Sequence, residues 1–184
     1  RYRSERRAAG GDRPGPYDRT LTFVVPLVAD QLHVQAIHRL ITDIPAGFDL
    51  PAALDAFFVR EPAGPVTTDF ARRVVDEAAL CLVHADGTGE LLRPRADAFV
   101  GVRDLDSARL VSALAAIPHE IRYQHGVDHV LAALAAGAAQ WGVLLRPVTV
   151  ADIEATAHER VLMPPKSTFF APKPRTGLLF RSVA

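Results

Sequence analysis

The sequence predicts an α+β fold: several helices packed on a mixed or antiparallel sheet of short strands, closed by a proline-rich C-terminal loop and strand. Two patterns indicate this fold. Short β-branched runs alternate with segments of helical apolar spacing, and a turn sequence joins two of the runs as a hairpin. Composition agrees, because 49% of the 184 residues are hydrophobic and 23% are charged, as in a globular domain with a sizeable core.

The first segment, residues 1–19, is basic and ends in turn-forming residues. It contains six arginines, two adjacent glycines and two prolines, which indicates the end of a helix that runs into a linker. A solvated boundary segment is preferred here over an arm that binds nucleic acid. Residues 20–184 then form the α+β domain. Since the chain starts at Arg1 without Met, we expect a fragment or a processed product with further residues upstream.

The first half of the domain begins with a strand and two capped helices. Residues 20–29 are apolar and β-branched, which is typical of a strand. Asp49 is the predicted N-cap of a helix over 50–58. Thr67 or Thr68 is the predicted cap of a second helix, whose shared apolar face contains Phe70, Val74 and Ala78.

A hairpin and an alternation of helices and strands follow. Residues 80–83 and 90–93 flank Asp86-Gly87, a hairpin signal. Asp106 opens a helix in which Leu110, Leu114 and Ile117 recur at helical spacing. The remaining predicted elements are a strand at 120–124, a helix at 127–136 ended by Gly137, a strand at 140–146, a helix from Thr149 to His158 with Asp152 completing a capping box, and a strand at 176–181.

Charge and cysteine content exclude several classes of protein. The formal net charge is +0, so the whole molecule has no field that attracts nucleic acid or an anionic membrane. The longest apolar runs, 21–29 and 130–139, are shorter than the roughly 20 residues of a membrane-spanning helix. Cys81 is the only cysteine, which excludes an intrachain disulfide and favours a cytoplasmic location. We therefore expect neither nucleic acid nor a membrane as a partner.

The tail LMPPKSTFFAPKPRTGLLF, residues 162–180, is the most distinctive segment. Its four prolines predict a stiff loop that loses little conformational freedom when it binds a ligand. The predicted anion-binding residues on this loop are Lys166, Ser167, Thr168, Lys173 and Arg175. Lys166 and Lys173 are the only lysines, against 19 arginines among the 21 basic residues. The alternative is a proline-braced strap whose lysines face water. The glycines of a phosphate-binding P-loop are absent.

Other side chains give weaker indications. His38 and Arg39 follow a half-buried run and are candidates for the wall that faces the tail, although a structural role is the preferred interpretation for His38. His125 and His129 have the spacing of helical metal ligands, but no third ligand is evident, so no metal site is predicted. Cys81 is interpreted as a core thiol. No catalytic residue is assigned.

The tail resembles the closing signature of the bacterial and archaeal family catalogued as domain of unknown function 1015 (DUF1015). Members end with Met-Pro-x-Lys-Ser-Thr-x-Phe-x-Pro-Lys, followed by Thr or Ser, Gly and an apolar strand. The matching positions here are Met163, Pro164, Lys166, Ser167, Thr168, Phe170, Pro172, Lys173, Thr176 and Gly177. Ala171 stands where an aromatic residue is common. The His38-Arg39 pair after an apolar strand is also similar to the family, and the resemblance covers about the C-terminal half of a full-length member.

The resemblance implies a function, but the family motif associated with that function is not in this sequence. Family members carry an upstream Asp-Gly-His-His-Arg motif similar to that of ParB-like folds, which include enzymes that phosphorylate free serine, and this motif is absent here. The resemblance implies a small-molecule kinase, with nucleotide and Mg²⁺ as cofactors and the missing N-terminal half as a partner. A non-catalytic module that binds an anionic metabolite is the alternative. DNA binding is disfavoured, since no basic recognition helix is present.

Overall fold

The computed structural model describes residues 2–10, 15, 18–19, 22–173, 177 and 180. The chain separates into two units, Val28–Ala171 and a smaller unit that combines Arg1–Leu27 with Pro172–Ala184. The smaller unit begins with helix α1 (Tyr2–Gly10), where the sequence predicts a helix. From this helix, Arg7 Nε donates a hydrogen bond to Asp18 Oδ1 at 3.0 Å.

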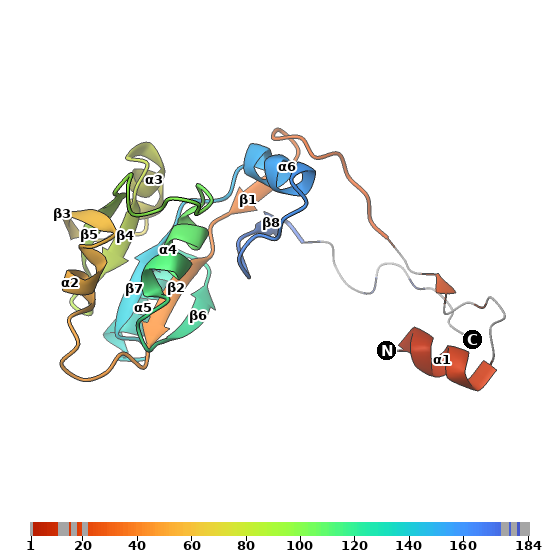
Figure 1. Ribbon diagram of the computed structural model, residues 1–184, viewed down its shortest axis with the longest axis horizontal. Coiled ribbons are helices and arrows are strands. Elements are labelled where there is room, and N and C mark those ends of the chain that lie inside the picture. The colour runs from red at the N-terminus through yellow and green to blue at the C-terminus, as the bar shows by residue number, and fades with distance from the viewer. Residues whose placement is uncertain are drawn as a thin grey trace. The chain divides into compact units, whose positions relative to one another are not determined.

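The larger unit is built on a six-stranded antiparallel sheet with the order β3-β5-β4-β7-β2-β6 (Figure 1). A second sheet pairs two short strands, β1 and β8. The strands are β1 (His33–Gln35), β2 (His38–Thr42), β3 (Phe58–Pro65), β4 (Leu80–Val83), β5 (Thr88–Pro94), β6 (Glu120–Gln124), β7 (Trp141–Leu144) and β8 (Phe169–Ala171). Short antiparallel strands with packed helices confirm the predicted α+β class.

Helices cover both faces of the large sheet. Their bounds are α2 (Leu50–Leu54), α3 (Phe70–Asp76), α4 (Asp106–Leu114), α5 (Val127–Ala135) and α6 (Val150–His158). One apolar cluster joins the sheet to α2 and α4, and a second cluster joins it to α3 and α5. Because side chains alternate along a strand, Leu80 and Leu82 of β4 belong to the first cluster and Cys81 and Val83 to the second.

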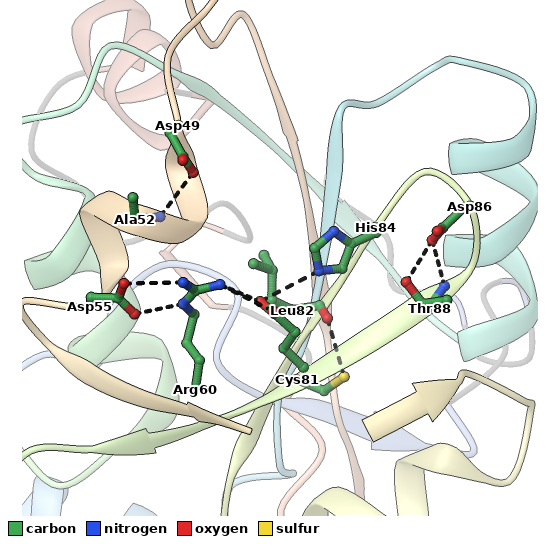
Figure 2. A network of polar contacts seen from close by, with 10 residues as sticks. Asp49, Ala52, Asp55, Arg60, Cys81, Leu82, His84, Asp86 and Thr88 are labelled. Carbon is green, nitrogen blue, oxygen red and sulfur yellow. Dashed lines mark hydrogen bonds and ion pairs between the residues drawn. The ribbon is translucent and has the colours of Figure 1, made fainter. Parts of the chain in front are cut away.

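Local signals in the sequence form as predicted at several positions, three of which Figure 2 shows at close range. Asp49 caps α2 by accepting a hydrogen bond from the Ala52 N–H. In the hairpin between β4 and β5, Gly87 has a φ of 81°, a conformation that glycine adopts without strain. The pKa of the Cys81 thiol is raised to about 12, chiefly by burial, so this residue is the inert core thiol that the sequence predicts.

A polar network ties the edge of the sheet to its interior (Figure 2). Arg60 on β3 donates to Asp55 Oδ1 at 2.6 Å and to Glu90 Oε2 at 2.8 Å. The His84 Nε2 lies 3.5 Å from the same Glu90 oxygen, and its ring packs edge-on against Trp141 with 4.9 Å between centroids. These contacts link the end of α2 to β3 and β5 through side chains that are mostly half-buried.

Some expectations about elements were wrong, and one lies outside the described residues. The helix expected over 50–58 ends at Leu54, and Phe58 begins β3. Residues 22–28 form no strand, and Phe23 and Val24 are exposed, because β-branched propensity makes no strand without a neighbouring partner. The N-cap of α3 is Asp69 rather than a threonine, and its side chain makes no capping bond. Of the strand expected over 176–181, only Gly177 and Phe180 are described, and neither is in a strand.

Candidate functional site

A cavity of about 420 Å³ lies in the larger unit. Its walls come from the start of β2, the N-terminus of α4, the segment that joins β7 to α6, and Ser167 of the tail. Two helices, α4 and α6, therefore begin at this cavity. The N-terminus of a helix carries partial positive charge and backbone N–H groups that favour an anion. The start of α4 has no side-chain cap, whereas the start of α6 is already capped by Thr149 and Asp152.

Arg39 on β2 supplies a buried positive charge to this cavity, with 3% of its surface exposed. Its Nη1 donates to Ile37 O at 2.6 Å and its Nη2 to Lys166 O at 3.2 Å, while the guanidinium lies 4.7 Å from the centre of the Tyr123 ring. Burial lowers the pKa of Arg39 to about 10, which Tyr123 partly offsets. Among the described residues no carboxylate forms an ion pair with Arg39.

Arg146, in the segment after β7, is the second arginine of the cavity and is already neutralised. Its Nη2 lies 2.5 Å from Asp106 Oδ1, and its Nε and backbone N–H donate to Asp106 Oδ2 at 3.0 and 2.9 Å. The Asp106 side chain is 3% exposed and that of Arg146 is 28% exposed. Hydrogen bonding to this carboxylate raises the pKa of Arg146. The pair holds the guanidinium in one orientation at the cavity wall.

Two serine hydroxyls join the tail to α4. Ser167 Oγ donates to Pro164 O at 2.7 Å and lies 3.0 Å from Ser107 Oγ. Since Ser167 has a single hydroxyl hydrogen and Pro164 accepts it, Ser107 is the donor in the contact between the serines. Both protons are therefore used within the protein. A ligand that takes a hydrogen bond from Ser167, as the sequence predicts, must displace the bond to Pro164.

The carboxylates at the cavity also have partners. Asp104 pairs with Arg109 at 2.7 Å. Asp152 Oδ2 accepts from the Thr149 N–H at 2.9 Å and from Thr149 Oγ1 at 2.6 Å, which completes the capping box that the sequence predicts for α6. Each of these carboxylates is therefore held in place by a hydrogen bond or an ion pair.

The predicted tail residues fall in different places. Ser167 lines the cavity, whereas Thr168 is half-buried and Lys166 is exposed at a left-handed φ of 56°. Lys173 belongs to the smaller unit, and Arg175 lies outside the described residues. The role of these residues in anion binding stays a prediction.

His38, predicted beside Arg39 on the facing wall, has a structural environment. It is buried, and its Nδ1 accepts a hydrogen bond from the Leu145 N–H at 3.3 Å. Its pKa is lowered to about 4 by burial, with smaller effects of the Arg39 and His125 charges, so the ring is neutral at pH 7. The ring of His125 packs 4.0 Å from that of Phe169 on β8.

No local signal in the sequence marks Arg146, Asp106 or Ser107 as site residues. Arg146 and Asp106 are 40 residues apart and Ser107 and Ser167 are 60 apart, so no spacing within a motif relates them. A second cavity, of about 810 Å³, is lined by residues of α4 and of the tail and by Arg103. Arg103 forms an ion pair with Glu159 there.

Within the part of the chain that the structure describes, no group of three or more His, Cys, Asp or Glu side chains is placed to hold a metal ion. No described helix has the length and apolar character needed to cross a membrane.

Comparison with known proteins identifies the fold. No protein-family profile matches the chain, and no curated protein is detectably similar in sequence. Among solved structures, two of a free serine kinase in complex with AMP, one of them a variant, match 81% of this chain with a TM-score of 0.51, at 10% and 13% identity. A conserved hypothetical protein from Pyrococcus furiosus matches 81% of it with a TM-score of 0.50 at 9% identity.

The chain thus has a fold similar to that of free serine kinases. It spans 58% of the length of the two kinase chains and 60% of the Pyrococcus furiosus protein. At these identities the likeness concerns the fold alone.

Proposed function

We propose that this chain is the C-terminal part of a small-molecule kinase, or of a related phosphoryl-transfer enzyme, that acts on a free amino acid such as serine and binds a nucleotide. The observation that carries the proposal is the cavity of about 420 Å³ in which two arginines and two helix N-termini converge. The similarity in fold to free serine kinases that bind AMP supports it.

Phosphoryl transfer suits such a site because the protein contributes mainly positioning and positive charge. The transferred group carries negative charge on its non-bridging oxygens, and fixed cations and N–H dipoles stabilise that charge. Arg146, held by Asp106, is a fixed N–H donor, and Arg39 supplies the buried positive charge. In the proposal, Lys166, Lys173 and Arg175 of the tail hold further phosphate or carboxylate oxygens, and Mg²⁺ accompanies the nucleotide.

The resemblance to the DUF1015 family adds the location of the remaining machinery. In this proposal the general base and most nucleotide contacts lie in a ParB-like N-terminal half, which is the partner of this chain within a longer protein. The cavity then forms one side of a site that two halves share.

Turnover tests the proposed function. The complete gene product is incubated with free serine and ATP or ADP, with and without Mg²⁺, and phosphorylated product is detected by ³¹P NMR. Formation of phosphoserine, reduced by Lys166→Ala, is the expected result. Absence of product with each nucleotide and with a panel of other free amino acids would refute the kinase assignment.

A second candidate is a non-catalytic module that binds an anionic metabolite and regulates a neighbouring enzyme. The specific observation in its favour is that Asp104, Asp106 and Asp152 at the cavity all have partners. Binding without turnover, unaffected by Mg²⁺, would support the module over the kinase.

A further inference from the structure

The two arginines of the cavity differ in how their charge is compensated. Asp106 accepts three hydrogen bonds from Arg146 and neutralises it. The acceptors around Arg39 are backbone carbonyl oxygens, among them Ile37 O and Lys166 O. Carbonyl groups satisfy N–H donors but carry no net charge, and within the part of the chain that the structure describes no carboxylate offsets the positive charge of Arg39.

A buried charge without a counter-charge is costly. Removing an ion from water costs several kcal/mol even after the protein relaxes, and only an opposite charge nearby offsets much of this cost. Arg39 is 3% exposed and nonetheless lines a cavity of about 420 Å³. The Tyr123 ring at 4.7 Å contributes a cation–π contact, which is a smaller compensation than an ion pair.

From this asymmetry we infer that the inner end of the cavity binds one compact oxyanion, a carboxylate or a phosphate, on the Arg39 guanidinium, where it replaces one or more of the carbonyl acceptors of Nη1 and Nη2. Arg146 is the fixed second donor, because the Asp106 contacts use its Nε and Nη2 and leave Nη1 outside the pair. The backbone N–H groups at the start of α4, which has no side-chain cap, complete the environment. The inference deepens the proposed function and concerns the same site.

The other charges of the cavity limit the ligand. Asp104 and Asp152 also line the cavity, but Asp104 is paired with Arg109, whereas Asp152 accepts from the uncharged N–H and hydroxyl groups of Thr149. Like charges repel, so a second anionic group on the ligand is disfavoured near Asp152 in particular. The expected ligand therefore presents one oxyanion to Arg39. If it has a second charged group, that group is a cation near the acidic side chains.

A titration maps the site without any substitution. The ¹⁵N-labelled chain is titrated separately with sodium phosphate and sodium acetate, with NaCl at matched ionic strength as the control. Amide shifts that saturate at Ser107, Arg146 and Thr149 are the expected result. Saturation with only one of the two salts identifies the oxyanion as phosphate or as carboxylate. Shifts confined to other parts of the chain, or no saturable shift with either salt, would overturn the inference.

Three variants distinguish oxyanion binding by Arg39 from an effect of the net charge of the chain. Arg39→Gln removes the uncompensated charge and is expected to weaken oxyanion binding by at least about tenfold, the usual loss for a charged hydrogen bond. Arg103→Gln is the control, because it changes the net charge equally but lies at the second cavity. This variant should bind the oxyanion with the affinity of the unmodified chain. Arg39→Lys retains the charge and should bind with intermediate affinity.

The alternative to binding is that Arg39 only fastens the tail through Lys166 O. In that case Arg39→Gln would loosen the tail, seen as faster amide exchange at residues 164–168, and would leave oxyanion affinity unchanged; this result contradicts the inference. If Arg39→Gln does not fold, the affinity of Arg39→Lys and the titration of the unmodified chain show whether Arg39 binds the oxyanion. Oxyanion binding without kinase turnover would refute the proposed function and leave the inferred site intact.

Discussion

Acid destabilisation through His38 is a prediction whose magnitude follows from the structure. The pKa of His38 is lowered from 6.5 to about 4 in the folded chain, with burial as the largest cause. Between these values the unfolded chain binds a proton that the folded chain does not, so the free energy of unfolding falls as pH falls from about 7 to about 4. The difference of roughly 2.5 pKa units corresponds to at most about 3 kcal/mol.

The assay is urea denaturation at a series of pH values, with His38→Gln compared to the unmodified chain. Glutamine does not titrate, so the free energy of unfolding of the His38→Gln variant should fall less than that of the unmodified chain as pH is lowered. At pH 4 the difference between the two losses should be about 3 kcal/mol. The variant is less stable at neutral pH, since the Leu145 N–H loses its acceptor. The test therefore compares the slopes of the free energy of unfolding against pH. His129→Gln, at an exposed position, is the control. Equal slopes for His38→Gln and the unmodified chain would refute the reasoning.

Three further predictions concern packing, capping and the buried ion pair. Gly142→Ala should destabilise the fold by about 1–3 kcal/mol, because the added Cβ would lie 2.7 Å from Val130 Cγ1, and Val130→Ala should recover part of the loss in thermal melts. Thr149→Ala removes a capping box and should cost about 1 kcal/mol in urea denaturation; an unchanged midpoint would contradict this. Asp106→Asn should cost about 2–3 kcal/mol and release Arg146, measurable as faster exchange of its Nε proton.

Elements with a local chemical signal were predictable from the sequence. The hairpin between β4 and β5 follows from Asp86-Gly87, because glycine suits the left-handed φ of 81° that the turn requires. The start of α6 follows from Thr149 and Asp152, whose side chains and backbone N–H groups satisfy one another within four residues. Such signals need no knowledge of tertiary contacts.

Strands whose partners are distant were harder to predict. β3 contains two prolines and a glycine, which argue against a strand, yet it pairs along β5 at the edge of the sheet, where prolines are tolerated. β8 lies within the proline-rich tail and pairs with β1, more than 130 residues earlier in the chain. Only the tertiary fold brings these strands together.

The same limit applies to the candidate site. His38-Arg39 and the tail attracted notice through their residue types, but the contact between Arg39 and Lys166 O spans 127 residues. The pairing of Arg146 with Asp106 likewise depends on how β7 leads into α6 beside α4. Which arginine keeps an uncompensated charge is thus a property of the fold, and it decides where an anion is expected.

Anomalous scattering from selenate tests the central claim most directly, because selenate is a compact oxyanion with a strong anomalous signal. Crystals of the chain are soaked in sodium selenate and an anomalous difference map is calculated. The account predicts a selenium peak in the cavity, within hydrogen-bond distance of the Arg39 guanidinium. A cavity without a peak, while Arg39 remains bonded to carbonyl oxygens alone, would contradict it.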